Sequence, residues 1–264
     1  MHRTIAIVNQ KGGVGKSTTA VNLGASLAIL GQRTLICDLD PQANATSGLG
    51  IQKAPASASS YGVIIEGCPL RDIAVPTDIT GLDLVPSSPH LAGAEIELVP
   101  LISRETRLRD ALEIAGESYE VVLLDCPPSL GLLTINALTA ATEVLIPIQC
   151  EYYALEGLSQ LLDSVRLVQK FLNSSLEITG VLLTMFDART RLAEQVATEV
   201  RRFFKTKMYE TVIPRSIRLA EAPSYGMPVI SFDSSSRGAE AYLSLAKEVV
   251  TRGRNTAALA GPVS

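Results

Sequence analysis

A short stretch near the start of the chain combines the residue types that bind phosphate groups. It covers residues 9–19 (NQKGGVGKSTT), after an apolar run at 5–8 and before a helical pattern at 20–30. Glycines between a strand and a helix let successive backbone N–H groups turn inward and bind an anion at the positive end of the helix. The residues predicted to surround the phosphates are Gly12, Gly13, Val14, Gly15, Lys16, Ser17 and Thr18.

The end of this stretch matches the phosphate-binding loop (P-loop) pattern G-x-x-x-x-G-K-[ST], which predicts that Lys16 reaches the β- and γ-phosphates and that Ser17 holds Mg²⁺. Gln10 stands where the first glycine of the pattern belongs, and a second lysine, Lys11, lies at the mouth of the loop. The alternative for Lys11 is a solvated loop lysine. The N-K-x-D signature of guanine-binding proteins is absent from the sequence, which favours ATP.

Two aspartates lie at the end of the apolar run 34–39. Asp38 and Asp40 precede Pro41, and the carboxyl end of a strand is the edge where α/β sheets bind ligands. These two carboxylates are therefore candidates for a role in phosphoryl transfer. Their alternative role is turn formation before a proline.

A third aspartate, Asp125, ends the apolar run 120–124 (EVVLL). Four apolar residues followed by an aspartate predict a strand whose carboxylate reaches the magnesium, usually through water. Pro127 and Pro128 stiffen the turn that follows, which suits a sensor of the γ-phosphate.

Strand and helix patterns alternate along the whole chain, ending with a helical pattern at 237–250. This order predicts an α/β fold with a doubly wound, mostly parallel sheet flanked by helices and the P-loop at its C-terminal edge. Apolar residues make up 47% of the chain but aromatic residues only 5%, so the core is aliphatic, as in parallel sheets. We expect one P-loop NTPase domain at 1–250 and a disordered tail at 251–264.

Several classes of protein are disfavoured by composition. No apolar run approaches the roughly 18 residues that span a bilayer, and the first strand begins at once, so a cytoplasmic protein is expected. The cysteines form no C-x-x-C pair, which argues against zinc, an iron–sulfur cluster or a disulfide framework. They are Cys37, Cys68, Cys126 and Cys150.

Basic residues concentrate in one segment, 189–218. It holds eight lysines and arginines and three acids, a net charge of 8 − 3 = +5, whereas the rest of the chain carries −4 − 5 = −9. Such a segment can bind DNA phosphates without sequence preference. Arg201 and Lys205 are one turn apart on a predicted helix, with Arg202 adjacent. A solvated helix face is the alternative.

Five blocks resemble the short chromosomal ParA/Soj ATPases: KGGVGKSTT, DLDPQANATSGLG, LLDCPPSLG, TMFDART and IPRSIRLAEAPSYGMP. The two differences from the usual P-loop pattern, Gln10 in place of the first glycine and the additional Lys11, match the deviant K-G-G-x-G-K-[ST] loop of the dimeric ParA/MinD group. The resemblance implies that Lys11 reaches the nucleotide of a partner subunit. It also implies that Asp40 orients the attacking water and that Asp38 lies near the magnesium shell.

The same resemblance implies further contacts. Adenine is expected near Met185 and near Pro214 and Ser216, although many relatives have asparagine where Ser216 stands. Arg189 and Arg218 join Arg201, Arg202 and Lys205 as implied contacts with DNA.

The implied function is that of an ATP-dependent homodimer that binds double-stranded DNA non-specifically on the nucleoid. A ParB/Spo0J-type partner with a basic N-terminal segment is expected to stimulate slow hydrolysis and release the DNA. The P-loop begins by residue 9, which leaves no room for the N-terminal helix-turn-helix of longer plasmid ParA proteins. Site-specific operator binding is therefore not expected.

Four alternatives remain open. A MinD-like membrane switch needs a C-terminal amphipathic helix, but 251–264 contains glycines and proline and no aromatic residue, so no membrane partner is expected. An iron–sulfur carrier needs paired cysteines. A metabolic ligase of the dethiobiotin-synthetase kind needs a small carboxylic substrate. A ParA-like ATPase that positions another cargo has the same chemistry.

Overall fold

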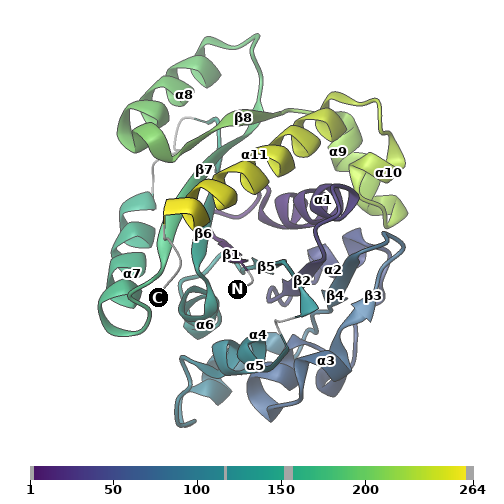
Figure 1. The fold of residues 1–264 in the computed structure, drawn as a ribbon, viewed down its shortest axis with the longest axis vertical. Coiled ribbons are helices and arrows are strands. Elements are labelled where there is room, and N and C mark those ends of the chain that lie inside the picture. The colour runs from purple at the N-terminus through teal and green to yellow at the C-terminus, as the bar shows by residue number, and fades with distance from the viewer. Residues whose placement is uncertain (1–2, 116–117, 152–156, 260–264) are drawn as a thin grey trace.

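The computed structural model describes residues 3–115, 118–151 and 157–259. Within these ranges, eight strands form one sheet in the order β3-β4-β2-β5-β1-β6-β7-β8 (Figure 1). Neighbouring strands are parallel except for β3, which is antiparallel to β4. The predicted doubly wound, mostly parallel sheet is confirmed. The strands are β1 (Arg3–Ile7), β2 (Thr34–Asp38), β3 (Val75–Pro76), β4 (Leu82–Val85), β5 (Val121–Asp125), β6 (Glu143–Gln149), β7 (Glu177–Phe186) and β8 (Met208–Pro214).

Helices cover both faces of this sheet (Figure 1). Successive side chains of β1 point to opposite faces. Ile5 and Ile7 join a core with α1 and α11, whereas Ala6 and Val8 join a core with α4 to α8. The helices are α1 (Lys16–Ile29), α2 (Asn44–Gly48), α3 (Leu70–Ile73), α4 (Leu91–Leu98), α5 (Arg107–Ala115), α6 (Leu132–Ala140), α7 (Leu158–Phe171), α8 (Arg191–Phe204), α9 (Ile217–Glu221), α10 (Val229–Phe232) and α11 (Arg237–Leu259).

The register of the central strands sets two of the predicted carboxylates side by side. Asp38 is opposite Asp125 in the pairing of β2 with β5, and Ile7 is opposite Asp125 in the pairing of β1 with β5. The P-loop follows β1, so it also begins at this carboxyl edge of the sheet. One edge therefore holds the phosphate loop and the acidic residues, as the sequence predicts.

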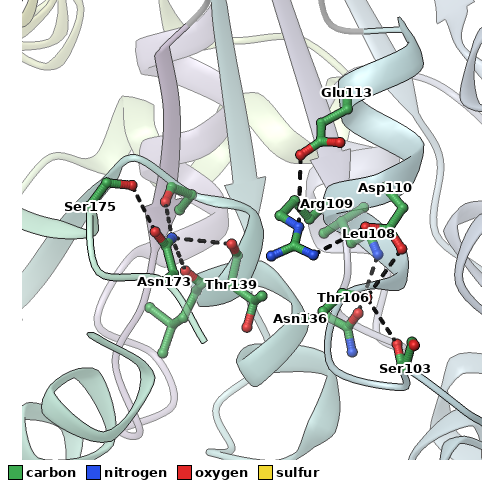
Figure 2. Close-up of polar contacts among 12 residues, drawn as sticks. Ser103, Thr106, Leu108, Arg109, Asp110, Glu113, Asn136, Thr139, Asn173 and Ser175 are labelled. Carbon is green, nitrogen blue, oxygen red and sulfur yellow. Dashed lines mark hydrogen bonds and ion pairs between the residues drawn. The ribbon is translucent and has the colours of Figure 1, made fainter. Parts of the chain in front are cut away.

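Two asparagines hold α6, the helix that follows the loop after Asp125 (Figure 2). The fully buried Asn136 accepts a hydrogen bond from the backbone nitrogen of Leu108 (3.2 Å) and donates one to the backbone oxygen of Arg104 (2.7 Å). The side-chain amide of Asn173 donates to backbone oxygens at the carboxyl end of α6, including that of Ala141 (2.6 Å). These bonds fix α6 against α5 and against the turn before β7.

The last helix is longer than predicted. α11 continues to Leu259, which corrects the predicted disordered tail for residues 251–259; residues 260–264 lie outside the described ranges. No helix in the described part of the chain is long and apolar enough to cross a membrane.

Contacts at residues 252 and 253 hold α11 against the sheet beyond residue 250. Arg252 donates hydrogen bonds to the backbone oxygens of Thr179 and Met208, which anchors the helix to the sheet. A β-carbon at Gly253 would overlap the guanidinium of Arg3. This glycine therefore permits a close approach and does not end the helix.

Candidate active site

The P-loop has the backbone geometry of an anion-binding turn. Gly13 and Gly15 have positive φ angles of 75° and 89°, a conformation that favours glycine. Gly15 is the N-cap of α1, and no side chain caps the first turn of that helix. The backbone N–H groups at the start of α1 can therefore bind a phosphate.

Lys16 is a buried cation at the base of this loop. Its side chain is 6% exposed, and its Nζ donates a hydrogen bond to the backbone oxygen of Lys11 (3.2 Å). Burial lowers the pKa of Lys16, while the charge of Asp125 opposes this effect. A bound phosphate would supply further negative charge to a cation that has lost most of its hydration.

Asp125 is a buried carboxylate at the end of β5. Among the described residues nothing bonds to either of its oxygens, and it is fully buried. Burial raises the pKa of Asp125 well above its ordinary value, and the charge of the Asp38 carboxylate raises this pKa further. The nearby Ser17 hydroxyl lowers the pKa of Asp125, although the two groups do not meet the geometry of a hydrogen bond. Unsatisfied buried oxygens of this kind fit a cation.

Magnesium fits this position together with a nucleotide. The described residues contain no group of three or more His, Cys, Asp or Glu that could hold a metal by itself. Mg²⁺ usually takes one or two protein ligands plus substrate phosphates and water. Ser17 and Asp125 are the residues that would hold it here, and Ser17 lines the cavity beside the P-loop.

Asp38 lies beside Asp125, but its oxygens hold the protein backbone. Asp38 Oδ2 accepts hydrogen bonds from the backbone nitrogen of Thr46 (2.8 Å) and from Thr46 Oγ1 (2.7 Å), and Oδ1 accepts one from the backbone nitrogen of Asp40 (3.1 Å). Burial raises the pKa of Asp38 to about 6, and the bonds from Thr46 oppose the rise. Neither Asp38 nor Asp125 lines the cavity, but the oxygens of Asp38 are already occupied, so its magnesium role stays a prediction.

The cavity beside the P-loop has a volume of about 430 Å³. It brings together most of the predicted phosphate-binding residues with Asp40 and Met185. Val14 is buried instead, and its backbone oxygen accepts a hydrogen bond from Thr184 Oγ1 (2.9 Å). Pro128, in the turn predicted to sense the γ-phosphate, also lines the cavity; residues of its wall that sequence reasoning missed are Val21, Asn22, Gln42, Asn44, Ser47, Gly48, Pro223 and Met227.

The predicted adenine contacts are only partly brought to this cavity. Met185 lines it and has a positive φ of 51°, which is strained for a residue with a side chain. Pro214 lines a separate surface depression with residues of α11, and Ser216 lines neither. The base contacts at Pro214 and Ser216 stay predictions, while Pro223 and Met227 provide apolar walls nearer the P-loop.

Lys11 lies at the mouth of the loop, outside the cavity wall. Its Nζ is 3.5 Å from Glu151 Oε2, and the two side chains are 38% and 49% exposed. Its backbone nitrogen donates a hydrogen bond to Asn9 Oδ1 (2.9 Å). Exposed ion pairs contribute only about 0–1 kcal/mol, so this contact can be exchanged for another anion.

The predicted DNA-binding residues fall into two groups. Arg189 pairs with both oxygens of Asp187 (2.9 and 2.7 Å), and Arg218 lies 3.0 Å from Glu221 and 3.2 Å from Asp233. The second group, on and just after α8, is exposed and forms no ion pair with a described residue. It consists of Arg201, Arg202 and Lys205.

The buried carboxylates predict a pH-dependent stability. The pKa of Asp38 is about 6 in the folded protein and about 3.9 in an unfolded chain. The contribution of Asp38 to the free energy of unfolding is fully present below about pH 4 and is lost as the pH rises through about 6. The free energy of unfolding falls by roughly 3 kcal/mol over this range. We expect nucleotide-free protein to have a lower Tm at pH 7.5 than at pH 5.5.

Replacing Asp38 with asparagine should flatten this dependence, whatever it does to absolute stability. The measurement is the slope of Tm against pH for the two proteins by differential scanning calorimetry. Equal slopes would contradict the assignment.

Comparison with known proteins agrees with this geometry. A family model described as "AAA domain" matches residues 2–178. The chain is 61% identical over 253 residues to the sporulation initiation inhibitor protein Soj of Bacillus subtilis, covering 96% of this chain and 100% of Soj. It is 51% identical to the chromosome partitioning protein ParA of Caulobacter vibrioides, covering 98% and 97%.

Solved structures share the whole fold. Cobyrinic acid a,c-diamide synthase from Mycobacterium smegmatis, with bound ADP and magnesium, superposes with a TM-score of 0.85 at 35% identity over 96% of both chains. The septum site-determining protein MinD from Pyrococcus horikoshii, complexed with Mg-ADP, has a TM-score of 0.75 at 25% identity over 94% of this chain and 96% of MinD.

The fold and the site therefore define a P-loop ATPase that uses ATP and Mg²⁺. The chain belongs to the ParA/Soj family, whose relatives include the sporulation initiation inhibitor protein Soj and the chromosome partitioning protein ParA.

Proposed function

We propose that this protein is an ATP-gated DNA-partitioning ATPase of the cytoplasm that works on the nucleoid. An ATP sandwich dimer binds DNA non-specifically, and a ParB/Spo0J-type partner stimulates slow hydrolysis and releases it, moving a chromosome or plasmid. The observation that carries this proposal is that the two lysines of the P-loop lie in different environments. Lys16 is buried beside Asp125, whereas Lys11 lies at the loop mouth in an exchangeable ion pair.

The residues of the site have separate tasks in hydrolysis. The P-loop N–H groups and Lys16 bind the phosphates and neutralise the charge that develops on the transferred group. Ser17 and Asp125 would hold Mg²⁺, which would supply further neutralisation when bound. Asp40 orients the attacking water. Lys11 exchanges Glu151 for the nucleotide of the partner subunit, which makes the dimer depend on ATP.

DNA binding is assigned to the cations on and just after α8. Arg201, Arg202 and Lys205 form no ion pair with a described residue that DNA must displace, unlike Arg189 and Arg218. Dimerisation doubles the phosphate contacts and so doubles the exponent of the salt dependence. The monomer then binds DNA weakly, whereas the ATP-bound dimer binds DNA with higher affinity.

Charge reversal at Arg202 tests the DNA-binding part of the proposal. We expect Arg202→Glu to raise the Kd for DNA at least about tenfold in the presence of ATP and to lower the salt slope by at least about two, because each dimer loses two contacts. Arg218→Glu should have a smaller effect, because Glu221 and Asp233 already pair with Arg218. Fluorescence anisotropy with a DNA duplex at several salt concentrations measures the Kd and the salt slope.

The matched control is Arg71→Glu. Arg71 is 74% exposed on α3, far from α8 (Figure 1). It should leave the DNA affinity unchanged. An Arg202→Glu variant that retains wild-type DNA affinity and salt slope would remove α8 from the DNA surface.

A metabolic ligase is the second candidate, because the similar Mycobacterium smegmatis structure is named cobyrinic acid a,c-diamide synthase. Such an enzyme would turn over ATP only with a small carboxylic substrate and would ignore DNA. ATP turnover measured with DNA and a ParB-type protein, and separately with cobyrinic acid, distinguishes the two.

A further inference from the structure

The peptide unit of Asp40 is held at both ends by buried side chains. Asp38 Oδ1 accepts a hydrogen bond from the Asp40 nitrogen (3.1 Å), and Ser87 Oγ donates one to the Asp40 oxygen (2.6 Å). Asp38 and Ser87 are both fully buried. The backbone of Asp40 cannot shift without breaking a bond that has no water to replace it.

Thr46 joins these two supports. Its Oγ1 donates a hydrogen bond to Asp38 Oδ2 (2.7 Å) and accepts one from the Ser87 nitrogen (2.9 Å). Thr46 is fully buried on α2. The bonds form a closed ring of four residues in which Asp40 alone lines the cavity.

The side chain of Asp40 has one anchored oxygen and one free oxygen. Oδ1 accepts a hydrogen bond from the Gln42 nitrogen (2.9 Å). No described residue donates a hydrogen bond to Oδ2. The ring therefore fixes the main chain, the bond from Gln42 fixes the side chain, and Oδ2 remains to accept a hydrogen bond from a ligand or water.

We propose that Asp38, Thr46 and Ser87 are positioning residues that hold Asp40 in its water-orienting geometry. Asp38 serves hydrolysis through this ring and not as a magnesium ligand. The inference rests on the proposed role of Asp40. It adds three supporting residues, which are Asp38 on β2, Thr46 on α2 and Ser87 in the segment after β4.

Thr46→Val tests the ring, because valine keeps the shape of threonine and removes both bonds of the hydroxyl. A small misplacement of a reacting group can cost up to about 100-fold in rate. We expect kcat for ATP hydrolysis by the full chain to fall about tenfold, with the Kd for ATP unchanged. Thr46→Ser keeps the hydroxyl and should restore kcat.

A matched control and a second variant complete the test. Thr139→Val makes the same change at a buried threonine of α6 whose hydroxyl has no partner in the described residues, so kcat should not change. Ser87→Ala removes the hydroxyl's bond to the Asp40 oxygen, which keeps the bond from the Ala43 nitrogen (2.9 Å), and should lower kcat about threefold. This variant tests the ring if Thr46→Val fails to fold.

The outcomes separate this inference from the proposed function. Wild-type kcat in both Thr46→Val and Ser87→Ala, while Asp40→Ala is inactive, overturns the ring and leaves the role of Asp40 intact. A fall in ATP affinity equal to the fall in kcat, or no rescue by Thr46→Ser, also overturns it. Wild-type hydrolysis by Asp40→Ala overturns the proposed role of Asp40 itself.

Discussion

Lys16→Ala raises the Kd for ATP at least about 100-fold. The substitution removes a buried cation whose bonds to phosphate are charge-assisted, and about 3 kcal/mol of lost binding corresponds to that factor. Hydrolysis then disappears with binding at ordinary ATP concentrations. Isothermal titration calorimetry with magnesium and a non-hydrolysable ATP analogue measures the change.

Lys53→Ala is the matched control, since Lys53 is an exposed lysine outside the cavity. It should bind the analogue as the wild-type protein does. An unchanged Kd in Lys16→Ala would mean that the cavity beside the P-loop is not where the phosphates bind.

Asp40→Ala has the second large effect, on the rate and not on binding. We expect kcat to fall at least about 100-fold while the Kd for ATP stays within about twofold, because the role proposed for Asp40 is to orient water and not to hold phosphate. Steady-state phosphate release and nucleotide titration give the two numbers. The ATP-bound state should therefore persist in this variant.

The exposed Asp72 provides its control, because Asp72→Ala removes a carboxylate from α3 without touching the cavity. Hydrolysis by Asp40→Ala at the wild-type rate would show that another group orients the water.

The phosphate site could be predicted because its signals are local. Glycines, Lys16 and Ser17 lie within one short stretch, and the alternation of strands and helices places the ends of β2 and β5 at the same edge. The sequence therefore predicted that Asp38 and Asp125 both lie at this edge, whereas their pairing on adjacent strands came only from the structure. Their different tasks depend on partners that spacing does not reveal.

Asp38 illustrates that limit. Its oxygens are taken by Thr46 and by the backbone of Asp40, and Ser87 completes the ring from a distant part of the chain. Asp125 has the same residue type and strand position, but its oxygens have no hydrogen-bond partner among the described residues, which is why we propose it as the ligand of the cation. Only the tertiary contacts distinguish a positioning carboxylate from a metal ligand.

Charge counting has a similar limit in the basic segment. It treats Arg189 and Arg202 alike, but Asp187 neutralises Arg189 through two bonds, whereas Arg202 is unpaired among the described residues. The cavity walls at Pro223 and Met227 were missed because apolar residues in a loop give no signal of a binding surface.

In the proposed mechanism, ATP joins two subunits through Lys11. The most direct measurement is the molar mass of Asp40→Ala by light scattering with magnesium and ATP. The account predicts about twice 28.1 kDa for this variant, and 28.1 kDa when Lys11→Ala is added, with nucleotide still bound. A mass of 28.1 kDa for Asp40→Ala at saturating ATP, or an undiminished dimer without Lys11, would contradict it.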